Sequence, residues 1–311
     1  MRKFYSILIA LFITLGISAQ TIIYSNNFEN STGDASIIGN GAIVEEGTAS
    51  FGSVFHNAAG GQAIRANYLL LPEDIFAKLQ ESGSKELSIA FWVNKGTAVD
   101  NFWTPMFSAY GAAPDNNVNT WPMMVLQSRL VAQVNNAGWT DLTDVQNLNG
   151  VNSVTTEWLD DNAWHFYTAT FSESAVNIYI DGDLKNSWIL TGGDGSTVSG
   201  LFTNGADLKY ICLGGNQAWN WADPDPAYMY DDITIYSSLL DVTQIEVIIT
   251  AKSGTAVKQF DFSGDVVNEE YISITGVKAG NDFSTLKPGI YIKKDTYSNG
   301  AVKSTKIGKL K

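Results

Sequence analysis

The sequence predicts an all-β protein, an antiparallel β-sandwich jelly roll followed by a small C-terminal β domain. Residues 164–171 and 176–180 carry β-branched and aromatic side chains at a period of two, which is typical of strands. Similar short runs recur between clusters of Gly, Asn and Asp, at the intervals typical of sandwiches and barrels. Helical patterns are few: residues 73–80 follow Pro72, and residues 242–249 fit either a helix or a strand.

The clearest segment is a β-hairpin. A short polar connection, residues 172–174, joins its first two strands. Asp181-Gly182 then supplies the positive φ angles that a type I′ turn requires. Further strands of the sandwich are predicted over residues 22–25, 87–93, 123–126, 130–134, 210–214 and 233–236.

The first 19 residues are predicted to be a secretory signal peptide. Arg2 and Lys3 precede an apolar run, residues 4–17, which ends in a small-residue cleavage site at Ala19. The run is short for a membrane span, and no second run of spanning length follows, so we expect no transmembrane segment in the mature chain. Cys212 is the sole cysteine, so the exported protein needs a large core instead of disulfides, and we expect Cys212 to be buried there.

Charge separates two regions of the mature chain. Seven basic and 26 acidic residues lie between residues 20 and 250, whereas ten basic and six acidic residues follow Thr250. The acidic region argues against a nucleic-acid partner, because phosphates need a basic surface. It is compatible with neutral polysaccharides and with Ca²⁺, and ordinary solvation of a secreted surface explains it equally well.

The predicted domains follow this division. Residues 20–249 form the jelly roll, residues 250–255 a short polar linker, and residues 256–311 the C-terminal β domain. Strands of the last domain are expected over residues 257–262, 271–274, 290–294 and 302–307.

Catalytic patterns are weak. Glu45-Glu46, Glu73-Asp74 and Asp160-Asp161 are adjacent pairs, which point to opposite faces of an extended chain, whereas glycosidases need two carboxyls facing one bond. His56 and His165 are the sole histidines, too few for a histidine-based zinc site, and His165 lies within a predicted strand. The sequence therefore favours a non-catalytic protein without an organic cofactor, although a carboxyl pair from distant strands stays open.

The strongest candidate for ligand binding is the loop at residues 214–226. Trp219 and Trp221 are expected to stack on sugar rings, while Asn216, Gln217 and Asp223 bond to hydroxyls. The alternative is that one or both tryptophans cap the sandwich edge as ordinary core.

Residues 21–249 resemble the laminin-G-like, concanavalin A-like jelly-roll family. Four segments carry the resemblance: an opening strand and turn at residues 27–34, a core strand at 87–93, the hairpin at 164–182, and a closing strand at 230–236. The resemblance implies a β-sandwich that binds carbohydrate or another surface ligand.

The resemblance also implies a structural Ca²⁺ between the opening turn and the closing strand. Its ligands would be Glu29, Asp34, Asp231 and Asp232 with backbone carbonyls. Asp231 shares the strand parity of Ile233 and Ile235 and is expected to point inward, where a carboxylate needs a partner. Bonding of Asp231 to backbone N–H groups is the alternative to a metal.

The tail resembles the C-terminal sorting domain of the type IX secretion system. The segments are residues 283–292, Asn299-Gly300 and residues 303–307; the N-terminal half of that domain is shortened here. The resemblance implies a Bacteroidetes-type bacterium, passage across the outer membrane, and release or surface attachment, with the tail either cleaved or retained. We expect a secreted or cell-surface protein that binds a polysaccharide, a glycoconjugate or a cell-surface protein. The alternatives are a glycan-degrading hydrolase and a protein-binding adhesin.

Overall fold

The computed structural model describes residues 20–29, 31–48, 50–58, 67–98, 104–113, 120–137, 143–144, 155–214, 225–252, 266–273, 278–297 and 302–309. Its contacts divide the chain into two compact units, residues 1–249 and 250–311. The predicted signal peptide, residues 1–19, lies outside the described residues. No helix within the described ranges is long and apolar enough to cross a membrane.

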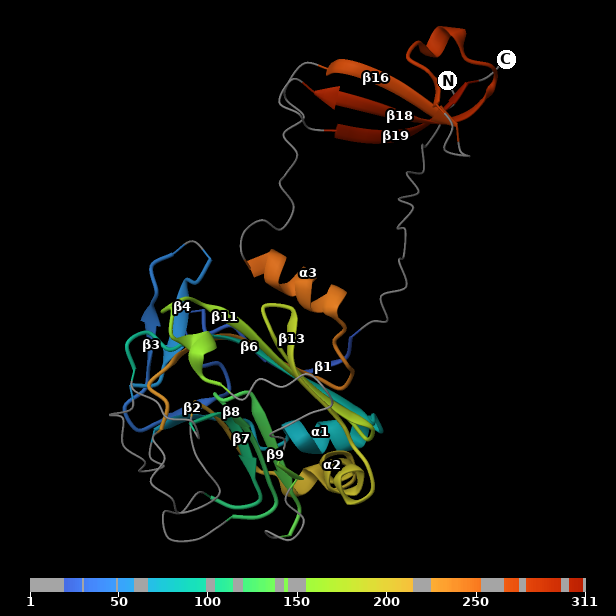
Figure 1. The fold of residues 1–311 in the computed structure, drawn as a ribbon. Coiled ribbons are helices and arrows are strands. Elements are labelled where there is room, and N and C mark those ends of the chain that lie inside the picture. Colours follow the sequence, from blue (N-terminus) through green and yellow to red (C-terminus); the bar gives the residue numbers. More distant parts are fainter. Residues whose placement is uncertain are drawn as a thin grey trace, which may run out of the picture. The chain divides into compact units, whose positions relative to one another are not determined.

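Among the described residues, the first sheet of the larger unit comprises eight antiparallel strands. Seven of them follow the order β13 (Asp183–Ile189), β12 (Ala175–Ile180), β11 (His165–Ser172), β6 (Glu86–Asn94), β15 (Met229–Tyr236), β4 (Ser53–His56) and β3 (Ala42–Glu45). The eighth, β1 (Ile22–Asn26), pairs with the C-terminal half of β15, and β4 pairs with the first two residues of β15. Figure 1 labels several of these strands, among them β6, β11 and β13.

The second sheet contains seven antiparallel strands in the part of the chain that the structure describes. Their order is β10 (Thr143–Asp144), β9 (Val131–Asn135), β8 (Met123–Gln127), β7 (Pro105–Tyr110), β14 (Tyr210–Leu213), β5 (Tyr68–Leu71) and β2 (Ser36–Ile38). Each sheet joins a run of consecutive strands to strands distant in sequence, and the described pairs are antiparallel, so the antiparallel sandwich predicted from the sequence is confirmed.

Aromatic side chains fill the main core of the larger unit. The Phe91 ring stacks on Tyr167 of the next strand, with centroids 5.1 Å apart, and meets Tyr230 edge-on at 5.9 Å. Phe107 and Ile211 of the second sheet belong to the same cluster of buried side chains. Three neighbouring strands of the first sheet are therefore joined by one aromatic group.

Cys212 is free and fully buried, as predicted. Burial raises the pKa of its thiol, which keeps it protonated. It packs in a smaller cluster with Tyr110, Met123 and Val125, and not in the main core.

The predicted hairpin is confirmed. Thr168 faces Tyr179 across β11 and β12, and Asp181 and Gly182 have φ angles of 53° and 88°. Both angles are positive, as the tight turn requires.

Two helices cover one part of the sandwich. α1 (Ile75–Ser82) begins two residues later than predicted and buries Ile75, Phe76 and Leu79. α2 (Gly193–Thr203) lies beside it and was not predicted, since its first turn contains two glycines, which have low helix propensity. Within α2, a Cβ atom on Gly200 would lie inside contact distance of the Asn136 side chain, which would have to move to admit a larger residue.

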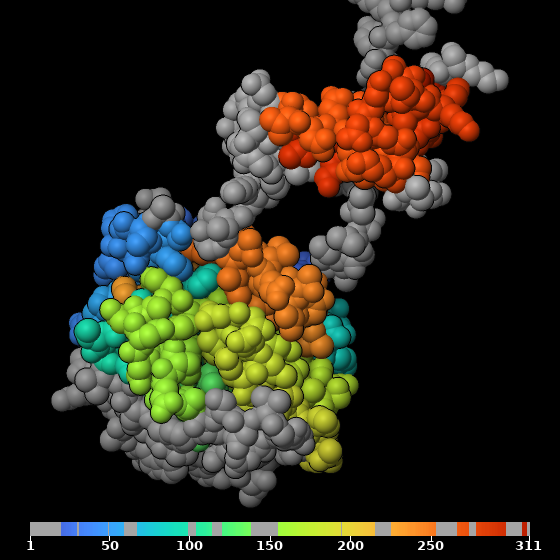
Figure 2. Space-filling model, turned by 45° about the horizontal axis from the view of Figure 1, so that its top comes forward, coloured from blue at the N-terminus to red at the C-terminus, as the bar shows by residue number. Residues whose placement is uncertain are grey.

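The third helix, α3 (Val242–Lys252), forms where the sequence allowed a helix or a strand. It lies over strands of the first sheet (Figures 1 and 2), where Ile245 packs with Trp92 and Phe166 in a second apolar cluster. The helix includes the first three residues of the predicted linker, 250–252, which are therefore helical; residues 253–255 lie outside the described part.

The smaller unit contains a four-stranded antiparallel sheet. Its order is β17 (Lys278–Gly280), β16 (Val266–Ser273), β18 (Gly289–Tyr297) and β19 (Val302–Lys309). Lys293 of β18 joins two neighbouring carboxylates, with Nζ 2.5 Å from Glu269 and 2.9 Å from Asp295. The strand predicted at 257–262 and the turn at Asn299-Gly300 lie outside the described residues.

Candidate functional site

The predicted saccharide-binding side chains cannot be located on the fold. Trp219, Trp221, Asn216, Gln217 and Asp223 all lie in residues 215–224, outside the described part of the chain. The two ends of this loop are described. Gly214 follows β14, and residues 225–228 lead into β15.

Both ends of the loop meet one buried side chain. The amide Nδ2 of Asn57 lies within hydrogen-bonding distance of the backbone oxygens of Gly214 and Pro226, the latter at 2.7 Å. Asn57 itself is fully buried. The loop therefore leaves and rejoins the sandwich at a single place, beside the end of β4.

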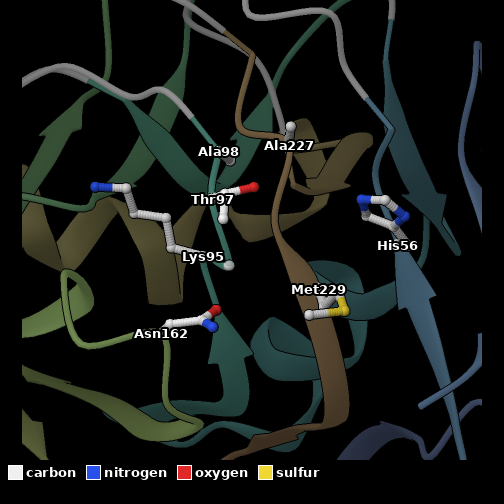
Figure 3. Close-up of a pocket in the computed structure, with 8 residues that line it drawn as sticks. His56, Lys95, Thr97, Ala98, Asn162, Ala227 and Met229 are labelled. Atoms are coloured by element: carbon white, nitrogen blue, oxygen red, sulfur yellow. The ribbon is translucent and has the colours of Figure 1, made fainter.

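A pocket of about 420 Å³ lies next to this place (Figure 3). Its lining comes from four segments that adjoin neighbouring strands of the first sheet. They are the end of β4, the residues after β6, the residues before β11 and the start of β15, which contribute His56, Lys95, Gly96, Thr97, Ala98, Asn162, Ala227 and Met229. The volume falls within the range of about 300–1,000 Å³ that is usual for small-ligand sites.

Strand pairing places the pocket side chains. Met229 faces both His56 of β4 and Asn94 of β6 across the sheet, so these side chains share one face. Asn94 shapes the turn after β6, because its Oδ1 accepts a bond from Gly96 N at 2.6 Å while its Nδ2 donates to Asn162 O at 3.3 Å.

The described pocket lining is more apolar than polar, carries a few polar groups, and contains neither Asp nor Glu. It offers the Thr97 hydroxyl, the Asn162 amide and the His56 imidazole. Lys95 lies at one side, with Nζ 2.6 Å from Asp160. Such a lining can bond to hydroxyl groups, but it does not place two carboxyls across a scissile glycosidic bond.

At least one carboxylate of each adjacent acidic pair makes a local contact. Asp160 pairs with Lys95, and Asp74 with Lys78 at 3.0 Å. Glu46 accepts bonds from Thr48 and, at 3.2 Å, from the indole of Trp164, and hydrogen bonding of this kind lowers its pKa even though partial burial opposes the shift. These carboxylates stabilise turns and loops.

The expected calcium ligands are not assembled into a metal site. Among the described residues, no group of three or more His, Cys, Asp or Glu side chains is placed to hold a metal ion. Glu29 instead accepts a long bond of 3.4 Å from Ser53 N. Bound Ca²⁺ at Glu29, Asp34, Asp231 and Asp232 stays a prediction.

The predicted orientation of Asp231 is wrong, although its burial is complete. A β-bulge lies between Asp231 and Thr234, and Asp232 has a φ of 46°. The bulge shifts the parity, so Asp231 faces Trp92 on the outer side of the sheet, whereas Ile233 points into the main core.

His165 binds two carboxylates. Its Nδ1 lies 2.7 Å from Asp181 Oδ2 and its Nε2 lies 3.0 Å from Asp161 Oδ1. Bonds to Asp181, with those to Asp161, raise the pKa of His165 although partial burial opposes them. Asp181 also accepts a bond from Phe166 N at 2.8 Å, so the imidazolium links the hairpin turn to the residues before β11.

This link predicts a pH-dependent stability. Because the folded pKa of His165 lies above the unfolded value of about 6.5, the charged contacts stabilise the fold fully below about pH 6.5 and are lost as pH rises through the folded pKa. We expect the difference in unfolding free energy between the natural chain and His165→Gln to follow this course in urea titrations. A difference that does not change with pH would contradict the assignment.

Sequence patterns missed the pocket. His56, Lys95, Asn162 and Ala227 are isolated, ordinary residues in the sequence, and the pairing of β4, β15 and β6 brings them together. The sequence carried one indirect signal, since the predicted binding loop ends immediately before Ala227.

A family model described as Laminin_G_3, concanavalin A-like lectin/glucanases superfamily, matches residues 65–246, more than half of the chain. Among curated proteins none matches.

Solved structures with a similar fold include a domain of an enzyme and a domain of a toxin. Domain 4 of AbnA, a GH43 extracellular arabinanase from Geobacillus stearothermophilus, in complex with arabinotriose, is 17% identical, with a TM-score of 0.46 over 73% of this chain and 97% of that chain. The binding domain of botulinum neurotoxin DC in complex with rat synaptotagmin II is 15% identical, with a TM-score of 0.47 over 91% and 73%.

Proposed function

The chain belongs to the concanavalin A-like lectin/glucanases superfamily, and we propose that it is a secreted or cell-surface protein that binds carbohydrate without catalysis. The pocket supports this proposal most directly. It joins hydroxyl, amide and imidazole groups in one hollow, and its described lining contains no carboxylate. Sugar hydroxyls bond to such groups, and hydrolysis needs the carboxyl pair that this lining lacks.

The proposed ligand surface combines the pocket with the loop beside it. Residues 215–224 begin after Gly214 and end just before Asp225, two residues from Ala227 in the pocket wall. Trp219 and Trp221 would offer flat apolar faces to sugar rings, with Asn216, Gln217 and Asp223 as polar partners. The ligand is accordingly a polysaccharide or glycoconjugate long enough to contact both.

The hydrolase alternative is tested by product release. The purified protein is expected to migrate more slowly in gels that contain a polysaccharide it binds, and to release no new reducing ends when it is incubated with that polysaccharide. Release of reducing ends above a buffer control would overturn the non-catalytic assignment.

We also propose that the C-terminal unit directs export by the type IX secretion machinery after the signal peptide is removed. The support is the order of turns and basic strands in residues 283–307. A chain truncated after Thr250 is expected to stay inside the cell, and its level in the medium and on the surface is the measurement. An undiminished extracellular level would contradict the sorting role.

A further inference from the structure

A buried polar cluster lies behind the pocket wall. It consists of Asn57, Asn67 and Asp225, whose exposures are 0%, 2% and 2%. Asn57 follows the pocket residue His56, and Asp225 lies two residues before the pocket residue Ala227. Buried polar side chains are retained where they make specific hydrogen bonds, so the partners of this cluster indicate what it holds.

Asn57 forms hydrogen bonds with backbone groups of the segments that adjoin β5, β14 and β15. Its Nδ2 reaches the carbonyl oxygens of Asn67 at 3.1 Å, of Pro226 at 2.7 Å, and of Gly214. Its backbone N donates to Tyr228 O at 3.0 Å. An amide nitrogen carries two hydrogens, so Nδ2 can donate to two of these three carbonyls at a time.

Asn67 and Asp225 complete the connection. Asp225 Oδ2 lies 3.3 Å from Asn67 N and 3.4 Å from Asn67 Nδ2. The Asn67 Oδ1 atom accepts a bond from Asn40 N at 3.0 Å. The segment that enters β15 is thus tied to the start of β5 as well as to the end of β4.

These bonds act on the pocket through the backbone. Asn57 bonds to Pro226 O and Tyr228 O, on either side of Ala227, while its own neighbour His56 forms the facing wall. Figure 3 shows Ala227 and Met229 on one segment and His56 on the adjacent strand. Asn57 therefore extends the tie between the two walls beyond the pairing of Met229 with His56, to the residues on either side of Ala227.

We propose that Asn57 is a positioning residue for carbohydrate binding, which holds the pocket wall at residues 225–228 and the adjoining Gly214 in place. It acts from behind the site without contacting the ligand. The expected effect on glycan binding rests on the proposed function, whereas the expected effect on hydrogen exchange at residues 225–230 needs no ligand.

The test uses the full mature chain with Asn57→Ala and Asn57→Asp, and Asn186→Ala as the matched control. Asn186 of β13 is also a buried asparagine, and its Nδ2 donates to Leu130 O at 2.9 Å. It is not part of the pocket lining. Hydrogen exchange at residues 225–230 and retention on a printed glycan array are measured for each variant.

Both Asn57 variants are expected to exchange residues 225–230 about tenfold faster or more, and to lose array binding at neutral pH. The Asn186 variant keeps both properties. Loss of binding by Asn57→Asp is expected to reverse as pH falls, because a protonated carboxyl regains a donor toward the carbonyls, whereas Asn57→Ala does not recover.

Unchanged exchange at residues 225–230 in both Asn57 variants would overturn the positioning role. Equal loss of protection there in Asn186→Ala would overturn it too, since any buried asparagine would then have the same effect. If the natural chain bound no glycan on the array, the proposed function would fail, and the exchange comparison would still decide the role of Asn57.

Discussion

Replacing Trp219 and Trp221 together by alanine is expected to abolish carbohydrate binding while leaving the folded far-ultraviolet spectrum unchanged. Aromatic side chains at the centre of a binding surface commonly contribute about 2 kcal/mol or more each. Loss of two such contacts corresponds to about a thousandfold in affinity, which takes a modest glycan interaction below detection. Titration of the best-retained polysaccharide against both proteins is the measurement.

The double variant with phenylalanine at both positions is the matched control. Phenylalanine keeps a flat apolar face and loses the indole N–H, so this variant should retain part of the affinity that the alanine variant loses. Wild-type affinity in the alanine variant would remove the loop from the binding site. A variant that fails to fold would place the two rings in the core instead.

Filling the pocket is expected to have the second largest effect. Thr97 is exposed and lines the pocket, so Thr97→Trp would place an indole in a hollow of about 420 Å³ without disturbing buried residues. We expect at least about a tenfold loss of affinity, the equivalent of about 1.4 kcal/mol. Calorimetric titration with the same polysaccharide measures it.

Thr203→Trp provides the control for this substitution. Thr203 is also exposed, but it ends α2 and is not part of the pocket lining. Both variants replace an exposed threonine by tryptophan, so they differ only in where the new side chain lies. Equal affinities for Thr97→Trp and Thr203→Trp would exclude the pocket from the ligand surface.

Features set by local sequence could be predicted. The hairpin from β11 to β12 depends on alternation within each strand and on Asp181-Gly182, and both signals lie within about twenty residues. Burial of Cys212 followed from its apolar neighbours. The helix α1 was predicted for the same reason, since Pro72 and the apolar spacing after it are local.

Features set by tertiary pairing could not be predicted. The pocket needs the register in which Met229 faces His56 and Asn94, residues far apart in sequence. The orientation of Asp231 depends on a bulge at Asp232, which an alternating pattern does not reveal and which reverses the face of every preceding side chain. The helix α2 forms although it contains glycines, because packing in the folded unit overrides their low helix propensity.

The central claim is that this sandwich binds carbohydrate, and a glycan array probed with the intact mature chain tests it most directly. The probe is run with and without Ca²⁺, so that the predicted ion is tested in the same measurement. We expect retention on at least one class of polysaccharide, and stronger retention with Ca²⁺ if the predicted ion supports the site. Absence of retention on every glycan under both conditions would contradict the claim.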